Sequence, residues 1–150
     1  MKRQVLTLTS ALLLGGCGES GPPEYLKIAG GGIQFNYRVS EASMIVIAQQ
    51  KQPLPEGSTV EALFDIPGTN TRESVTLPSL EGKLTYKLQS SKLTNITKGG
   101  QYKVTIRLLD AKGKVLDRKE TTYVSDEDQS TLPTKPLVDG PALSPQLQNL

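Results

Sequence analysis

The 150-residue chain has no histidine, no tryptophan and a single cysteine, and its aromatic residues are few, two Phe and five Tyr. Without histidine it lacks the side chain that Ser–His–Asp and Cys–His catalysis and most zinc sites require, which excludes those classes of site. One cysteine cannot form an intramolecular disulfide, so the fold must be held by its core. Scarce aromatic rings disfavour a sugar-stacking platform, although binding of a small ligand stays an alternative. No cofactor and no metal site is predicted.

The first residues combine a short basic start with an apolar run. Lys2 and Arg3 precede residues 5–14, which are mostly apolar. About ten apolar residues suffice for a secretory signal core and are too few to span a bilayer. The stretch Leu14-Gly15-Gly16-Cys17 then resembles the lipobox of bacterial lipoprotein signal peptides. An ordinary secretory signal with a cysteine there by chance is the alternative.

This resemblance implies a specific modification of Cys17. In bacterial lipoproteins the cysteine thiol receives a diacylglyceryl group, the chain is cut before it, and the new amino group is acylated. Two or more acyl chains hold a protein stably on a membrane. Residues 1–16 are therefore expected to be a signal peptide, with Cys17 as the lipid attachment residue. Gly18 stands where an Asp would resemble an inner-membrane retention signal, which favours the outer membrane and leaves the leaflet open.

The charge of the remaining chain is balanced. Removal of residues 1–16 takes Lys2 and Arg3 with it, so the 17 basic residues fall to 15 and equal the 15 acidic ones. A protein that binds DNA, RNA or an anionic lipid surface through charge usually has a clear basic excess. We therefore expect no nucleic-acid partner.

The rest of the chain divides into three parts. Residues 17–24, with Pro22 and Pro23, are expected to form a short tether. Residues 25–124 are expected to be one domain. Residues 125–150 contain four prolines and show neither helical nor strand periodicity, which predicts a disordered Pro-rich tail. A docking role for Pro133-Thr134-Lys135-Pro136 in an extended conformation is the alternative.

Apolar and polar residues alternate with a period of two over most of the central region. This pattern is typical of half-buried antiparallel strands. It occurs in four runs, led by Ile33, Phe35, Tyr37 and Val39; by Val60, Ala62, Phe64 and Ile66; by Leu84, Tyr86 and Leu88; and by Tyr102, Val104, Ile106 and Leu108. Residues 44–48 are continuously apolar, as in a central strand. Turn residues separate the runs, so we predict an all-β sandwich of seven or eight strands without a helix.

One local motif sharpens this prediction. Ile96 lies six positions before Tyr102, with Gly99 and Gly100 between them. The segment resembles the corner that leads into strand F of immunoglobulin-like and fibronectin type III domains. The resemblance implies that the Tyr102 hydroxyl bonds back to the backbone, that Ile96 enters the core and that a glycine supplies the bend. It implies strands over 101–109 and 114–124 in a single antiparallel immunoglobulin/fibronectin III-like sandwich, with the subfamily left open.

No catalytic or ligand-binding constellation stands out. The acidic candidates are predicted to be solvated charges on outward strand faces or turns: Glu61, Asp65, Glu73, Glu81 and Asp110. Asp126-Glu127-Asp128 lacks the spacing of a calcium loop and is expected to be a solvated patch. Gly30-Gly31-Gly32 is expected to be a connector or a strand bulge, and the sequon at Asn95 to be chance. A docking patch of outward Leu63, Leu109, Ile45 and Ile47 is less favoured than scattered exposed aliphatics.

These observations favour a non-catalytic, lipid-anchored binding or adaptor lipoprotein in the cell envelope, at the outer membrane. Its expected partners are the membrane, through the N-terminal lipid, and an envelope protein. One alternative is a subunit of an envelope secretion or conjugation apparatus. Another is a carboxylate-based envelope enzyme. The oligomeric state is left open.

Overall fold

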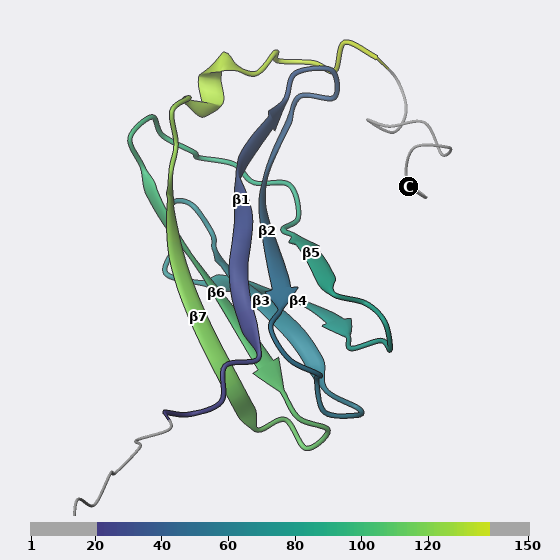
Figure 1. The fold of residues 1–150 in the computed structure, drawn as a ribbon. Coiled ribbons are helices and arrows are strands. Elements are labelled where there is room, and N and C mark those ends of the chain that lie inside the picture. Colours follow the sequence, from purple (N-terminus) through teal and green to yellow (C-terminus); the bar gives the residue numbers. More distant parts are fainter. Residues whose placement is uncertain (1–20, 139–150) are drawn as a thin grey trace, which may run out of the picture.

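A computed structural model describes residues 21–138 and contains seven strands in two antiparallel sheets (Figure 1). The strands are β1 (Leu26–Asn36), β2 (Glu41–Gln50), β3 (Thr59–Asp65), β4 (Arg72–Pro78), β5 (Thr85–Gln89), β6 (Gln101–Leu109) and β7 (Val115–Val124). One sheet has the order β1-β2-β5 and the other β4-β3-β6-β7. The fourth strand thus pairs with the third, whereas immunoglobulin constant domains place it beside the fifth. The predicted immunoglobulin/fibronectin III-like β-sandwich is confirmed.

The alternation in the sequence places one side of each sheet in a shared core. The residues predicted to face inward on β3, β5 and β6 include Phe64, Tyr86 and Val104, all fully buried. Residues 44–48 lie in β2, which is the central strand of its sheet as predicted. Burial of these apolar side chains is the main force that holds the two sheets together.

The corner before β6 has the geometry that the resemblance implied. The Thr97 backbone N–H donates to the Tyr102 hydroxyl at 2.9 Å, and Ile96 is 1% exposed. Gly99 supplies the bend with φ +76°. Gly100 supplies room, since a Cβ there would lie 2.8 Å from the Thr97 carbonyl oxygen and would collide with the Tyr102 hydroxyl.

The first alternating run ends earlier than predicted. β1 stops at Asn36, and residues 37–40 form a turn that contains Tyr37 and Val39. The Asn36 side chain accepts a hydrogen bond from the Arg38 N–H at 3.2 Å, which favours a turn over a continued strand. Two other run ends also lie outside strands: Ile66 follows β3, and Leu84 precedes β5 with 62% of its surface exposed.

The segment after β7 also differs from the prediction, because residues 125–138 pack on the sandwich instead of forming a disordered tail. Leu132 is 9% exposed and belongs to the core, and a short 3-10 helix (Gln129–Thr131) precedes it. The Gln129 N–H donates to the Ile96 carbonyl oxygen at 2.8 Å, and the Leu137 N–H donates to that of Arg38 at 2.7 Å. Leu132 and a few backbone hydrogen bonds hold this segment on the sandwich. Neither requires a repeating pattern of apolar residues, so the sequence of the segment did not predict its packing. Residues 139–150 lie outside the described part of the chain.

The two ends of the sandwich carry different segments. Residues 21–24 enter at one end, which also holds the loops 51–58, 79–84 and 110–114; we call this the near end. Residues 125–138 cross the opposite end, which also holds the turns 37–40 and 66–71 and the segment 90–100; we call this the far end (Figure 1). The start and the finish of the described chain are thus separated by the length of the strands.

Candidate functional site

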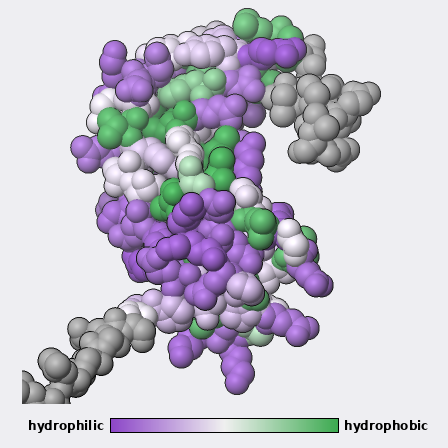
Figure 2. Space-filling model, in the orientation of Figure 1, coloured by the Kyte–Doolittle hydropathy of each residue, from purple (hydrophilic) through white to green (hydrophobic). Residues whose placement is uncertain are grey.

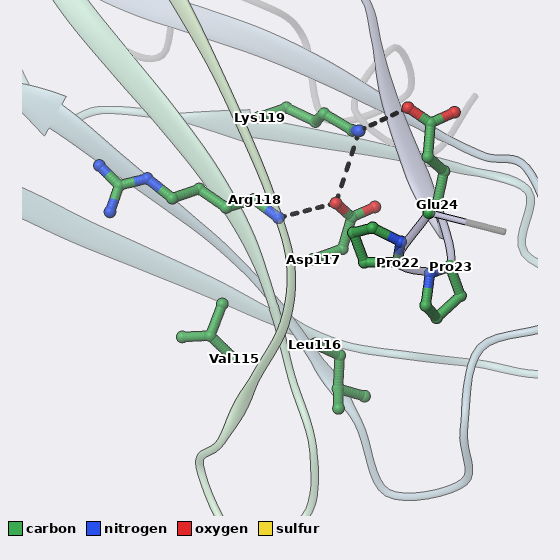
Figure 3. Close-up of a pocket in the computed structure, with 9 residues that line it drawn as sticks. Pro22, Pro23, Glu24, Val115, Leu116, Asp117, Arg118 and Lys119 are labelled. Carbon is green, nitrogen blue, oxygen red and sulfur yellow. Dashed lines mark hydrogen bonds and ion pairs between the residues drawn. The ribbon is translucent and has the colours of Figure 1, made fainter. Parts of the chain in front are cut away.

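A hollow of about 680 Å³ marks the place where the N-terminal segment meets the sandwich (Figure 3). Residues 21–24 form one wall, and the first half of β7, residues 115–119, forms the other. Within it, polar groups from the two segments are directed at one another. The hollow is therefore where the predicted tether joins the folded domain.

The carboxylate of Asp117 holds the start of β1. Its Oδ2 accepts hydrogen bonds from the backbone N–H groups of Tyr25 at 2.8 Å and Leu26 at 2.9 Å. Its Oδ1 accepts from the Arg118 N–H at 2.7 Å, and its side chain is only 8% exposed. Hydrogen bonds to an ionised acceptor are stronger than neutral ones, so Asp117 fixes where the chain enters the fold.

Glu24 is bound from two sides by lysines. Its Oε1 lies 2.9 Å from the Lys119 Nζ, and its Oε2 pairs with Lys51. The hydrogen bond from Lys51, and then that from Lys119, lower the pKa of Glu24 to about 2. Glu24 in turn raises the pKa of Lys119. Both groups are therefore charged at neutral pH. The four residues Glu24, Lys51, Asp117 and Lys119, which we call the N-terminal clamp, are suited to holding the chain in place and not to exchanging protons.

The N-terminal clamp is not apparent from the amino-acid sequence. Asp117 and Tyr25 are 92 residues apart in the chain, and nothing in either segment indicates the contact. The pairing of β7 with β6 shifts register between Leu108 and Leu109, close to the partner of Asp117. No pattern in the sequence predicts this shift.

The predicted solvated carboxylates on β3 are in fact engaged. Glu61 is 7% exposed, and it accepts hydrogen bonds from the Arg107 Nε at 2.6 Å and the Ser74 hydroxyl at 2.7 Å. Asp65 accepts from the Arg72 Nε at 2.8 Å and from the Lys103 N–H at 2.9 Å. Glu61 is thus held between Arg107 and Ser74 on the two neighbouring strands, which the alternation along its own strand does not reveal.

Glu61 and Asp65 lie four positions apart on one strand face, so their Cα atoms are about 13 Å apart. Glycosidase carboxyl pairs are roughly 5–9.5 Å apart. This pair therefore does not have the geometry of such a site.

The other acidic candidates lie apart from one another. Glu73 accepts from the backbone N–H of Ser91 at 3.0 Å and so links β4 to the segment after β5. Asp110 accepts from the N–H groups of Lys112 and Lys114 in the β6–β7 turn, and the Lys114 bond contributes most to lowering its pKa. Glu81 is exposed in the β4–β5 loop.

The acidic stretch after β7 has a structural role at one of its residues. Asp128 caps the 3-10 helix by accepting from the Ser130 N–H at 3.0 Å, and the bonds from Ser130 lower its pKa. Asp126 and Glu127 are exposed, as predicted for a solvated patch. Over residues 21–138 no group of three or more acidic or cysteine side chains could hold a metal ion.

The Gly30–Gly32 stretch forms the predicted bulge in β1, where the register with β2 shifts between Ile28 and Gly30. A Cβ on Gly31 would overlap the Tyr123 hydroxyl, so the missing side chain admits Tyr123 from β7.

In the sequon, Ile96 is buried and Asn95 has φ +61°.

The four outward aliphatic residues do not form one patch. Ile45 and Ile47 lie on β2, and Leu63 and Leu109 lie on β3 and β6 of the other sheet. All four are half-buried by their neighbours. The scattered arrangement agrees with the interpretation favoured from the sequence.

Cys17, the predicted lipid attachment residue, lies outside the described residues. No helix within residues 21–138 has the length and hydropathy needed to cross a bilayer.

No family model matches the chain, and no curated protein matches it. Among solved structures it is similar to OgpA from Akkermansia muciniphila, as the wild-type protein and as a catalytically inactive form in complex with an O-glycopeptide (glycodrosocin) substrate. Each match has 16% identity and a TM-score of 0.41 and covers 73% of this chain. The chain spans 30% of the length of OgpA. A likeness of this size carries no argument about function.

Proposed function

We propose that this protein is a lipid-anchored binding or adaptor lipoprotein of the cell envelope, held at the outer membrane through Cys17. The observation that carries the proposal is the sequence Leu14-Gly15-Gly16-Cys17 after a basic start and an apolar run, with the chain's one cysteine at the position that receives lipid. The described fold is compatible with this, because residues 21–24 approach the sandwich from outside at its near end.

The N-terminal clamp supports the proposal by giving the anchor a defined point of attachment. Cys17 and Glu24 are seven positions apart, a distance of at most about 25 Å when the chain is fully extended. Asp117, Lys119 and Lys51 then hold the chain from Glu24 onward. An anchored domain would keep its near end towards the membrane and present its far end, with residues 125–138, to other envelope proteins.

The side chains support a binding role over a catalytic one. The acidic candidates with strand positions are each engaged by basic or backbone groups, and Glu61 and Asp65 are too far apart for a glycosidase pair. The balance of 15 basic and 15 acidic residues after residue 16 fits attachment by lipid better than by charge.

The anchor is tested by feeding cells an alkyne-bearing palmitate analogue and comparing the native chain with a Cys17→Ala variant. The native chain should incorporate the label and sediment with membranes, and the variant should lose the label. A matched control joins residues 18–150 to a cleavable secretory signal without a cysteine, which should release the domain in soluble form. A native chain that begins at Met1 or remains unlabelled would contradict the proposal.

The adaptor role is tested separately, with a photo-crosslinking amino acid placed in intact cells at exposed Lys135 on the far end and, as a control, at exposed Glu81 on the near end. Capture of one defined protein from the far end supports the role. Random neighbours from both positions would count against it.

A further inference from the structure

The two sheets meet along a seam between β1 and β7, and this seam is closed at one end and open at the other. β1 is the edge strand of its sheet, and β7 is an edge strand of the other. The N-terminal clamp closes the near end of the seam, and the Tyr123 hydroxyl, 3.5 Å from the Gly30 carbonyl oxygen, bridges its middle. Towards the far end the strands leave a hollow of about 550 Å³, which we call the β1/β7 groove; it is lined by parts of residues 31–35 and by residues 122–127.

The floor of the groove is apolar. Ile33 and Phe35 pair with the buried residues Met44 and Ala42, so they face the core side of the sheet, yet both stay only half-buried. Tyr123 is also half-buried, and Val124 at the rim is 55% exposed. Figure 2 shows hydrophobic residues gathered over the far-end parts of β1 and β7, while the near-end half of the same face is hydrophilic.

The backbone beside this floor is open to another chain. Among the described residues, the backbone of β1 pairs with β2 alone and that of β7 with β6 alone. The hydrogen bonds that cross the seam come from the side chains of Asp117 and Tyr123, so the backbone edge beyond them is free. The carbonyl oxygens of Met44 and Ala42 in β2 accept from the Ser90 and Leu93 N–H groups, on the β5 side of that strand. Their partners in β1, Ile33 and Phe35, therefore turn their own backbone groups away from β2 and towards the seam.

The mouth of the groove carries negative charge. Asp126 and Glu127 are exposed there, and within residues 21–138 neither carboxylate has a hydrogen-bond or ion-pair partner. No lysine or arginine lines the groove. An occupant that carries lysine or arginine would complement this charge.

We propose that the β1/β7 groove binds an extended, basic segment of another envelope protein by β-augmentation. The segment pairs with the free edge of β1 at Ile33 and Phe35, lays apolar side chains against the side chains of these two residues, and directs a basic side chain at Asp126 and Glu127. Backbone pairing supplies affinity in this mode, and the side-chain contacts supply specificity. The chain's own residues 139–150 suit the groove poorly, because they contain Asp139 and two prolines and no basic residue. The envelope origin of the partner rests on the proposed function, but the binding mode does not.

The test uses the chain from residue 17 onward, with Cys17→Ser, in solution. The probe is a blocked peptide of about ten residues, the length of a long strand, in which valine alternates with lysine. Its control replaces each lysine with glutamate. The lysine peptide should shift the backbone NMR signals of residues 31–35 and 122–127, and the glutamate peptide should not. Asp126→Lys with Glu127→Lys should weaken binding about tenfold, since two exposed attractions become repulsions.

A matched control pair, Glu56→Lys with Glu81→Lys, makes the same charge change on exposed near-end loops and should leave binding unchanged. Equal binding of both peptides, shifts confined to β4 or β5, or equal weakening by both variant pairs would overturn the proposal. A chain that stops at Val138 tests the other occupants. If removal of residues 139–150 itself shifts the groove signals, or if sedimentation shows a dimer that the Asp126/Glu127 variant dissociates, the groove is filled by this chain and the proposal fails. Because no lipid is present, failure here leaves the anchor untouched.

Discussion

The corner before β6 gives the sharpest test of how this fold is held, through the substitution Tyr102→Phe. The change removes one oxygen from a side chain that is 8% exposed and leaves the ring in place. That oxygen accepts the Thr97 N–H at 2.9 Å, and no other acceptor for this N–H is present among the described residues. The Tyr102 hydroxyl also lies 3.4 Å from the Thr97 hydroxyl, beyond the usual range, so the substitution removes chiefly the bond from the Thr97 N–H.

The expected loss of stability lies between two limiting cases. A typical hydrogen bond contributes about 0.5–1.5 kcal/mol net, and a donor left without its partner costs about 1–3 kcal/mol if water cannot reach it. Thr97 itself is exposed, so water can replace part of the lost bond. We expect the free energy of unfolding to fall by about 1–2 kcal/mol, which lies between these two cases.

The measurement is urea unfolding at 25 °C followed by fluorescence or circular dichroism, with Tyr86→Phe as the matched control. The Tyr86 hydroxyl lies 3.4 Å from the Leu80 N–H, beyond the usual range, so its removal should cost less than about 0.5 kcal/mol. With a slope of about 1.5 kcal/mol per molar, Tyr102→Phe should lower the midpoint by roughly 1 M urea without a change in slope. Equal losses in both variants would show that the loss is general to buried tyrosines and would refute the assigned role of the corner.

Two further predictions concern the N-terminal clamp. Asp117→Ala removes the acceptor of the Tyr25 and Leu26 N–H groups, so those amides should exchange with solvent much faster while the buried β6 amides stay protected. The measurement is hydrogen exchange, with Asp117→Asn as a variant that keeps one acceptor oxygen. Unchanged exchange at both amides would contradict the assigned role of Asp117. Glu24 should titrate near pH 2 instead of 4.5 in a carboxyl-carbon NMR titration, so its contribution to stability is complete above pH 4.5 and is lost as the pH falls towards 2. Lys51→Met should move the pKa of Glu24 back up. A midpoint near 4.5 in the native chain would refute the pairing.

The sequence was most informative where interactions are local. Alternation of apolar residues predicts strands because each strand buries one side, and this located β3, β5 and β6 with their inward residues. The Tyr102 corner could be predicted because its bond spans five residues. The prediction that the first strand continues through Tyr37 and Val39 was wrong. An Asx turn at Asn36 ends the strand although apolar and polar residues still alternate beyond it.

Features that depend on distant segments were not predictable in this way. Asp117 in a polar stretch of β7 gives no sign that it will bind Tyr25. Leu132 is one apolar residue in a Pro-rich segment, and its burial depends on the space left over the Ile96 corner. The β1/β7 groove depends on how far two edge strands separate, which no pattern along either strand encodes.

The placement of the two ends of the described chain has a mechanical consequence. A pull on residue 21 in one direction and on residue 138 in the other acts along β1 and against β2, whose register runs antiparallel from Leu26 opposite Gln50 to Asn36 opposite Glu41. Such a load shears the backbone hydrogen bonds between β1 and β2 all at once, instead of breaking them one after another. A domain built in this way resists tension best along its long axis, in the direction in which a membrane tether at one end and a bound protein at the other would pull.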